Sequence, residues 1–185
     1  EDILLIVEPV PMAPMRRRWA EVQTEAEALA QRMEQAKTPR TRVNRQGELS
    51  ALLMGFAREI AAVQVLDPAC GSGNFLYVAL RLLLDLEKEV ITLAGQLGTG
   101  HFFPSVNPEQ LHGIELNPYA HELAQVTIWI GYIQWMRENG FGYPSEPILK
   151  PLDSIKRMDA IFAYDADGKP VEPEWPEADV IVGNP

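Results

Sequence analysis

Apolar positions recur with a helical period in the first third of the chain. Over residues 16–36 they return every three or four positions among strong helix formers, which predicts an amphipathic helix. The polar run 37–47, with its proline and glycine, predicts a loop. A second apolar stripe predicts a helix over 48–61. We therefore expect residues 1–61 to form a helical region.

After residue 61 the pattern changes to short apolar runs separated by helical stretches. The runs that predict strands lie at 63–66, 111–116, 148–152 and 179–182. Helices are expected over 75–92 and over 118–138, where Asn117 suits an N-cap and Pro118 the first helical position. This alternation is typical of an α/β fold with a parallel sheet. We expect residues 62–185 to form that domain.

The long connection before the fourth predicted strand contains a further signal. The run AIFAYDADGKPV, residues 160–171, has a turn sequence at Asp167 and Gly168 between apolar flanks. It predicts a hairpin at the surface, and its proline confines it to an edge position.

Each predicted strand is followed by, or ends in, a polar or Gly/Pro motif. The motifs are DPACGSGNF at 67–75, ELNP at 115–118, LDS at 152–154 and GNP at 183–185. In an open parallel sheet the carboxyl ends of the strands share one edge, and ligands bind there where the strand order reverses. We therefore expect the four motifs to converge on one binding site.

The first motif is a glycine loop between a strand and a helix. Gly71 and Gly73 lack Cβ atoms, so the backbone N–H groups can approach a ligand near the helix N-terminus. Asp67 is placed to accept a hydrogen bond from a ligand ammonium or to order the loop. The alternative is a tight turn that needs glycine for packing alone. Cys70 is expected to be a small packed residue, because no cationic neighbour would activate its thiol.

The main alternative for this glycine loop is the loop of a dinucleotide-binding fold. Its fingerprint requires a small residue where this chain has Leu76, and an acid about 20 residues after the loop. Glu115 lies much further along the chain. NAD is therefore disfavoured, although Glu115 at the end of the second strand still suits a ribose.

The distribution of charge says more about binding partners than the overall composition does. The 185 residues are 46% hydrophobic and 23% charged, as in an ordinary globular domain. The net charge of −10 argues against a self-sufficient nucleic-acid binder. Residues 15–58, however, hold nine Lys/Arg against five Asp/Glu. A basic arm that contacts a phosphate backbone and a solvated helix face with its loop both remain open.

Metal, disulfide and membrane signals are weak in this sequence. A single cysteine cannot form an internal disulfide, and a reducing cytoplasm is the expected location. Residues 1–10 do not resemble a signal peptide, and no apolar stretch has the length of a membrane helix. The three histidines lack metal-ligand spacing.

The ordered motifs resemble those of class I S-adenosylmethionine-dependent methyltransferases, specifically the adenine-N6 DNA methyltransferases. DPACGSGNFL together with IVGNP is particularly similar to the large restriction-modification and phage-defence enzymes of the MmeI branch. The resemblance covers about residues 48–185. It implies a Rossmann-like parallel sheet of order 3-2-1-4, flanked by helices, with an N-terminal helical extension.

The resemblance also implies roles for individual residues. The implied cofactor-binding residues are Asp67, Ala69, Gly71, Gly73, Asn74, Phe75, Glu115, Leu116 and Asp153. The residues of the glycine loop would surround the methionine part of S-adenosylmethionine. Glu115 would take the ribose hydroxyls, with Leu116 against the adenine. Asp153 would meet the adenine amino group, and a surface ion pair with Lys156 or Arg157 is the alternative for this residue.

The last motif implies the catalytic residues. The Asn184 side-chain oxygen and the Pro185 carbonyl would accept the two hydrogens of an exocyclic amine and orient it. The target adenine would first be flipped out of double-stranded DNA. The family motif continues with a second proline and an aromatic residue, and only four of about seven strands are accounted for. We therefore expect a fragment that does not methylate DNA alone and that reads DNA through other regions of the full-length protein.

Two other functions remain open. One keeps the enzyme class but takes glutamine in a protein, or an RNA base, as substrate, because an NPP-aromatic motif also suits planar amides. The other is a non-catalytic interaction module. Binding of S-adenosylmethionine would separate a cofactor-binding domain from a pure scaffold.

Overall fold

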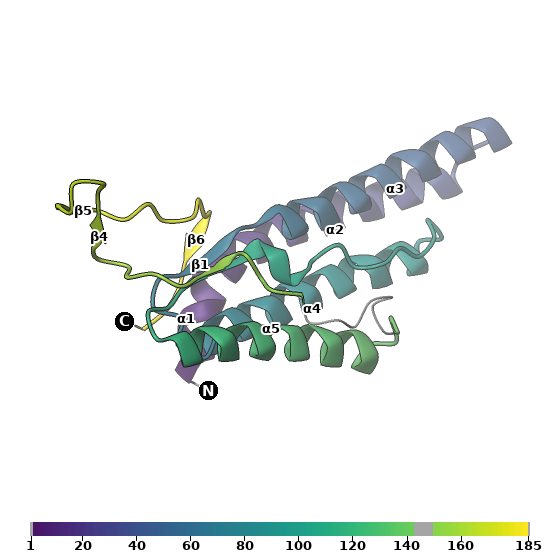
Figure 1. Ribbon diagram of the computed structural model, residues 1–185. Helices are drawn as coiled ribbons and strands as arrows, with labels where there is room; N and C mark the ends of the chain where they lie inside the picture. The colour runs from purple at the N-terminus through teal and green to yellow at the C-terminus, as the bar shows by residue number, and fades with distance from the viewer. Residues whose placement is uncertain (1, 143–149, 185) are drawn as a thin grey trace. The chain divides into compact units, whose positions relative to one another are not determined.

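The computed structural model describes residues 2–142 and 150–184 (Figure 1). Its contacts divide the chain into two compact units. Unit 1 consists of Glu1–Pro11, Val63–Leu82 and Asn107–Pro185, and unit 2 of Met12–Ala62 and Leu83–Val106. Residues 83–106 thus join the N-terminal helices, a grouping that the sequence boundary expected at 61/62 does not include.

The helices follow the sequence pattern closely. They are α1 (Asp2–Val7), α2 (Ala13–Glu34), α3 (Pro39–Ala62), α4 (Asn74–Gln96) and α5 (Pro118–Glu138), with a π-helical segment η1 (Glu8–Met12) and a 3-10 turn η2 (Pro108–Gln110). Among the described residues, no helix is both long and apolar enough to cross a membrane.

Unit 2 is built on the antiparallel pair of α2 and α3. Trp19 stacks on Phe56 with ring centroids 5.4 Å apart, and both side chains are buried. The Trp19 indole N–H donates to Glu89 on α4 at 3.0 Å. Glu87, fully buried, accepts the backbone N–H groups of Ser105 and Val106, which holds the segment after α4 in place. Both helices predicted over residues 16–61 are confirmed.

The loop predicted at 37–47 is wrong, because α3 begins at Pro39. Proline is well suited to the first helical turn, where its missing N–H costs nothing. The Thr38 hydroxyl accepts the Thr41 N–H at 3.2 Å and caps the helix start. Gly47 costs about 1 kcal/mol relative to alanine, which the packing of a 24-residue helix can offset.

Unit 1 contains a four-stranded parallel sheet. The strands in the described residues are β1 (Val65–Asp67), β2 (Leu111–Ile114), β3 (Ile155–Lys156), β4 (Ala163–Tyr164), β5 (Pro170–Val171) and β6 (Val180–Ile181). The sheet order is β3-β2-β1-β6, which confirms the expected α/β fold and the 3-2-1-4 order with β6 as the fourth strand. The antiparallel pair β4–β5 confirms the predicted hairpin, which extends away from the sheet in Figure 1.

The start of α5 follows from local sequence. The Asn117 side-chain oxygen accepts the N–H groups of Tyr119 and Ala120 at 2.9 and 3.2 Å, and Pro118 opens the helix. The helix ends before Gly140, which has a φ of +79°. The cap places α5 directly after β2.

The third predicted strand is displaced. Of the predicted range 148–152, residues 148 and 149 lie outside the described residues, and the remainder is not a strand. Pro151 has no N–H to donate to a strand ladder, and the Leu152 N–H donates to Gln125 on α5 instead. The pairing with β2 begins only at Ile155, which is buried opposite Gly113.

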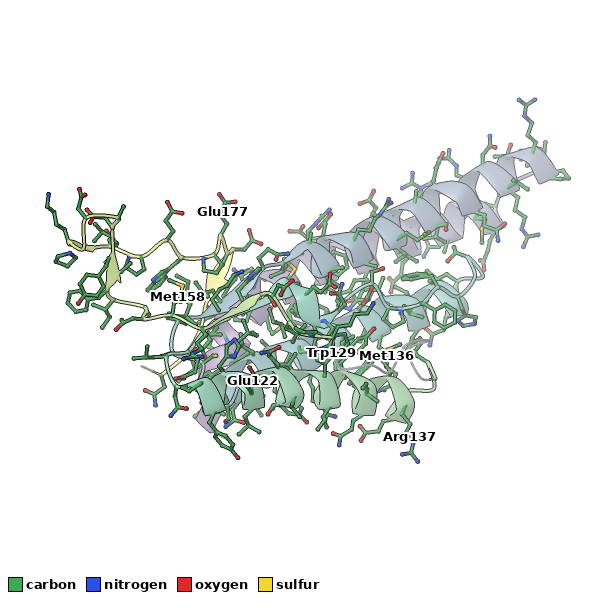
Figure 2. The ribbon with its side chains drawn as sticks, viewed as in Figure 1. Glu122, Trp129, Met136, Arg137, Met158 and Glu177 are labelled. Atoms are coloured by element: carbon green, nitrogen blue, oxygen red, sulfur yellow. The ribbon has the colours of Figure 1, made fainter. Side chains whose placement is uncertain are left out.

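The strand order reverses next to β1. The chain passes from β1 to β2 to β3 in one direction, and then returns past both strands to place β6 on the other side of β1. Met158 and Glu177, labelled in Figure 2, lie near the two ends of that returning connection. The carboxyl ends of β1 and β6 therefore flank the topological switch point of the sheet.

Candidate functional site

Asp67 is the last residue of β1 and is almost fully buried, with 1% of its surface exposed. Its Oδ1 accepts the Ala69 N–H at 3.1 Å. Burial raises the pKa of Asp67 to about 6, the hydrogen bond from Ala69 lowers it, and the nearby charge of Glu115 raises it further. The surroundings thus stabilise the charged form of Asp67 poorly, and a cationic ligand group beside it would stabilise that charged form.

The two glycines of the loop have different surroundings. Both have positive φ, +53° at Gly71 and +81° at Gly73. A Cβ at Gly73 would lie 3.1 Å from the backbone of Ala124 on α5, so this glycine is needed for packing. A Cβ at Gly71 would meet no atom within 4 Å. Packing alone therefore accounts for Gly73, whereas Gly71 faces open space.

Glu115 follows β2 directly and connects two segments. Its Oε2 accepts the Gly71 N–H at 2.9 Å, and its Oε1 accepts the Asn117 N–H at 2.7 Å. The carboxylate therefore holds the glycine loop to the start of α5. Each oxygen retains a further lone pair for a ligand hydroxyl. Leu116 beside it is 63% exposed and offers an apolar surface.

The carboxyl end of β6 lies directly against Asp67. A Cβ at Gly183 would come within 2.5 Å of the Asp67 Oδ1, and the φ of +149° also favours glycine. Asn184 follows and is exposed, whereas Pro185 lies outside the described residues. The first and fourth motifs are therefore brought together at the switch point.

The remaining residues of the glycine loop and of the start of α4 differ in their exposure. Ala69 is exposed in the loop. Asn74 and Phe75 form the first turn of α4, with Asn74 exposed and Phe75 half-buried. Leu76 is fully buried at the position where a dinucleotide-binding loop requires a small residue.

The structure does not bring Asp153 together with these residues. Asp153 precedes β3 by two residues, and β3 runs parallel to β2 with Ile155 opposite Gly113. It therefore lies on the amino side of that pair, away from Glu115, because the strand it was expected to follow is displaced. Asp159 follows β3 on the carboxyl side, half-buried, with its Oδ1 accepting the N–H of Ile161 at 2.8 Å. Pro151, within the predicted strand, was the sequence signal that could have shifted the expected strand toward Ile155.

The edge of the sheet is negatively charged around the loop. Burial raises the pKa of the Cys70 thiol to about 12, and the charges of Asp67 and Glu115 add to that increase. Cys70 also fills the space beside Gly113, whose Cβ would lie 2.8 Å from its sulfur, as expected of a packed residue. Two carboxylates at the loop favour a cationic ligand and disfavour a pyrophosphate.

Two hollows lie beside β3 rather than at this edge. One, of about 460 Å³, is lined by Glu122 and Trp129 of α5, both labelled in Figure 2, and by residues 150–153 and 155–157 near β3. The other, of about 670 Å³, is lined by Glu109, His112 and Trp175 among others. Asp67, Gly71 and Glu115 are not among the described residues that line them. The candidate site at the carboxyl edge of β1, β2 and β6, where the motifs converge, is therefore distinct from these two hollows.

Two relatives in the curated proteins match less than half of the chain. DNA methyltransferase A of Bacillus subtilis (strain 168) is 39% identical over 80 residues, which are 43% of this chain and 9% of that protein. A putative type II restriction enzyme and methyltransferase of Methanocaldococcus jannaschii is 30% identical over 84 residues, 45% of this chain and 7% of that protein. The match thus spans less than a tenth of each relative.

A solved structure and a family model extend the match. The type IIL restriction-modification enzyme MmeI, solved in complex with DNA, superposes with a TM-score of 0.54 at 24% identity, covering 85% of this chain and 19% of that one. This similarity supports the fold. The family model of the MmeI DNA-methyltransferase domain matches residues 36–185. Because that match includes most of the chain, the chain belongs to the MmeI DNA-methyltransferase domain family.

Proposed function

We propose that this chain binds S-adenosylmethionine as part of a DNA methyltransferase that transfers a methyl group to adenine N6 in restriction-modification or phage defence. The observation that carries the proposal is the convergence of Asp67, Gly71, Glu115 and Gly183 at the switch point of the sheet. The names of the relatives, a DNA methyltransferase and a restriction enzyme with methyltransferase, support the same reaction.

The charge and shape of the edge fit this cofactor. S-adenosylmethionine carries a positive ammonium and a positive sulfonium, which would stabilise the poorly compensated charge of Asp67. The open side of Gly71 leaves room for the methionine part, with Ala69, Asn74 and Phe75 around it. When bound, the cofactor supplies an electrophilic methyl group.

Three residues would hold the adenosine part. Glu115 would accept the ribose hydroxyls with its free lone pairs while it retains the backbone N–H groups of Gly71 and Asn117. Leu116 would cover one face of the adenine with its exposed side chain. We assign the adenine amino group to Asp159 instead of Asp153, since Asp159 follows β3 on the carboxyl side.

Asn184 would hold the substrate amine. Its side-chain oxygen would accept one N6 hydrogen and the Pro185 carbonyl the other, which orients the nitrogen lone pair without a covalent intermediate. Gly183 keeps the backbone of this segment against Asp67, so the amine site and the methionine site would adjoin. Double-stranded DNA with the target adenine flipped out is the proposed partner.

Calorimetric titration of the chain with S-adenosylmethionine tests the cofactor assignment. We expect saturable binding that Asp67→Ala weakens by more than tenfold, because the substitution removes the buried carboxylate. Asp153→Ala is the matched control, an exposed aspartate of the same unit, and should bind as the wild type does. Absence of saturable heat, or equal affinity in Asp67→Ala, would contradict the proposal.

The choice of base can be tested in DNA from cells that produce a full-length protein containing this chain. Nucleoside analysis should detect N6-methyladenine that is absent when Asn184→Ala replaces the wild type. Methylated cytosine in its place would contradict adenine as the target. Methylated protein glutamine or RNA without methylated DNA would favour the other substrates that the motif allows.

A further inference from the structure

The turn between α2 and α3 carries a cluster of positive charge. Residues 35–47, here called the basic tip, contain Lys37, Arg40, Arg42 and Arg45 and no acidic residue. Figure 1 shows this turn where the paired helices α2 and α3 meet. We propose that the basic tip contacts the phosphate backbone of duplex DNA. The proposal rests on the proposed function, which supplies DNA as the partner.

The cluster is an exception within an acidic chain. Unit 1 contains seventeen acidic and six basic residues, whereas unit 2 contains nine acidic and ten basic residues. Charges separated by more than about 10 Å are largely screened at moderate salt, so the local sign decides whether a phosphate is attracted. A repulsive net charge of −10 therefore does not exclude a contact at the basic tip.

Three of the four cations are available for a partner. Lys37, Arg40 and Arg42 are exposed and form no ion pair with acidic residues in the part of the chain that the structure describes. Arg45 pairs with Glu48 at 2.6 Å. Because α2 ends where α3 begins, the two helix dipoles offset each other there. The positive potential is therefore due to the side chains.

Hydrogen bonds fix the backbone that carries these charges. The Arg42 N–H donates to the Thr38 carbonyl at 3.1 Å, and the Thr38 and Thr41 hydroxyls are 2.8 Å apart. The Gln46 side chain donates to the Gly98 carbonyl at 2.7 Å within the same unit. A guanidinium presents a fork of donors that matches phosphate oxygens. A fixed turn with two free guanidiniums loses little backbone entropy on contact.

Such a contact would position the protein without reading sequence. Phosphate contacts carry no base information, and their contribution falls steeply with salt. Each phosphate neutralised contributes about −0.9 to the slope of log affinity against log salt. The slope is therefore the measurement that separates a direct phosphate contact from a general change of charge.

The experiment measures binding of a fluorescent duplex by the whole chain in anisotropy titrations over a series of salt concentrations. Arg40→Gln/Arg42→Gln removes two tip charges. Arg17→Gln/Arg58→Gln removes two charges from exposed positions at the other end of the helix pair, near the stacked Trp19 and Phe56. We expect the tip variant to reduce the magnitude of the slope by about 2 and to weaken duplexes of different sequence equally. The control should change it by less than about 0.5.

The outcomes separate this proposal from the cofactor assignment. No duplex binding by the wild type at low salt, or equal slopes for the two variants, would overturn the contact. Helical circular dichroism checks that both variants fold. Calorimetry with S-adenosylmethionine on the same proteins should give unchanged affinity. A tip-dependent salt slope in a chain that binds no S-adenosylmethionine would support the contact and contradict the proposed cofactor.

Discussion

The amino and carboxyl edges of the four-stranded sheet both carry polar groups, but these groups have different partners. At the amino edge the groups pair with one another. The Gln110 side chain donates to the Val63 carbonyl at 2.9 Å, and the Gln64 N–H donates to Asp179 at 2.8 Å. The Gln64 side-chain oxygen also pairs with a ring nitrogen of His112 at 2.7 Å. These bonds join the strands to one another.

Among the described residues, the carboxyl edge leaves hydrogen-bond acceptors unused. Asp67 is buried with a raised pKa, and Gly71 has open space where a side chain would stand. Glu115 holds two backbone N–H groups and keeps further lone pairs. Polar groups that form hydrogen bonds with one another stabilise a fold, whereas buried charged groups without a stabilising partner are candidates for contact with a ligand. Changes at the carboxyl edge should therefore alter cofactor affinity, and changes at the amino edge should alter stability.

Gly183→Ala should have the largest effect. The new Cβ would lie 2.5 Å from the Asp67 Oδ1, so the backbone or the carboxylate must move. We expect S-adenosylmethionine affinity to fall at least about a hundredfold, or about 3 kcal/mol, in calorimetry. Gly168→Ala is the control, since it also has a positive φ but meets no atom within 4 Å. It should cost about 1–2 kcal/mol of stability and leave the affinity unchanged. Wild-type affinity in Gly183→Ala would contradict the site.

Asp67 should make stability depend on pH. Its pKa is about 6 in the fold against an ordinary 3.8, so the folded state binds the proton more tightly. Its contribution to the unfolding free energy is complete below about pH 4 and is lost as pH rises through about 6, a change of about 3 kcal/mol. In urea unfolding, the wild type should lose stability over this range relative to Asp67→Asn, which retains an acceptor for Ala69.

The cofactor should show the opposite trend with pH. A cationic ligand favours the ionised carboxylate, so affinity should rise as pH increases through about 6 in the wild type. Asp67→Asn should give a flat profile. Equal pH profiles for the two proteins in both assays would show that Asp67 is not the titrating group.

Gln110→Ala should affect the other edge alone. The side chain is 3% exposed and serves both the Val63 carbonyl and the Asn107 N–H. Its loss leaves two backbone groups without these partners, and we expect a cost of about 2 kcal/mol in urea unfolding. Affinity for S-adenosylmethionine should stay within about twofold of the wild type. A large loss of affinity at wild-type stability would remove the distinction between the edges.

Glu115→Gln should weaken binding by more than the ribose contact alone. An amide has one acceptor oxygen, so either Gly71 or Asn117 loses its partner. We expect an affinity loss of about tenfold for S-adenosylhomocysteine. A 2′,3′-dideoxy analogue distinguishes the two roles. If Glu115 orders the glycine loop, this analogue, which lacks the ribose hydroxyls, should also bind about threefold more weakly to the variant than to the wild type. If Glu115 acts on the ribose only, the analogue should bind both proteins with equal affinity.

The two aspartates near β3 should give the smallest effect. Asp159→Asn retains an oxygen for the Ile161 N–H but loses a charged acceptor for the adenine amino group, and we expect about a fivefold loss of affinity. Asp153→Asn, on the amino side of β3, should bind as the wild type does. The reverse order in calorimetry would restore Asp153 as the adenine contact.

Where local sequence signals decided the structure, the sequence was sufficient. The Asn117–Pro118 cap placed the start of α5, so that Glu115 lies between the end of β2 at Ile114 and the helix. The Asp167–Gly168 turn placed the hairpin. Reversal of the strand order beside β1 followed from the family resemblance, and the parallel pairing of β1 with β6 confirms it.

Long-range pairing decided what the sequence did not predict. β3 has only two residues and exists because β2 offers it an edge, so no local periodicity marks it. The start of α3 was missed because a proline in a polar run predicts a loop, whereas Pro39 occupies the first helical position here. Gly73 packs on Ala124, whereas Gly71 faces open space. This difference depends on the position of α5, which the loop sequence alone does not determine.

The most direct test of the account is a titration of isotope-labelled chain with S-adenosylmethionine, followed by amide shifts in NMR spectra. The account predicts that the largest shifts occur at Gly71, Glu115 and Gly183, on the carboxyl edge of β1, β2 and β6. Shifts concentrated instead at Glu109, His112 and Asp153, beside the hollow near β3, would contradict it.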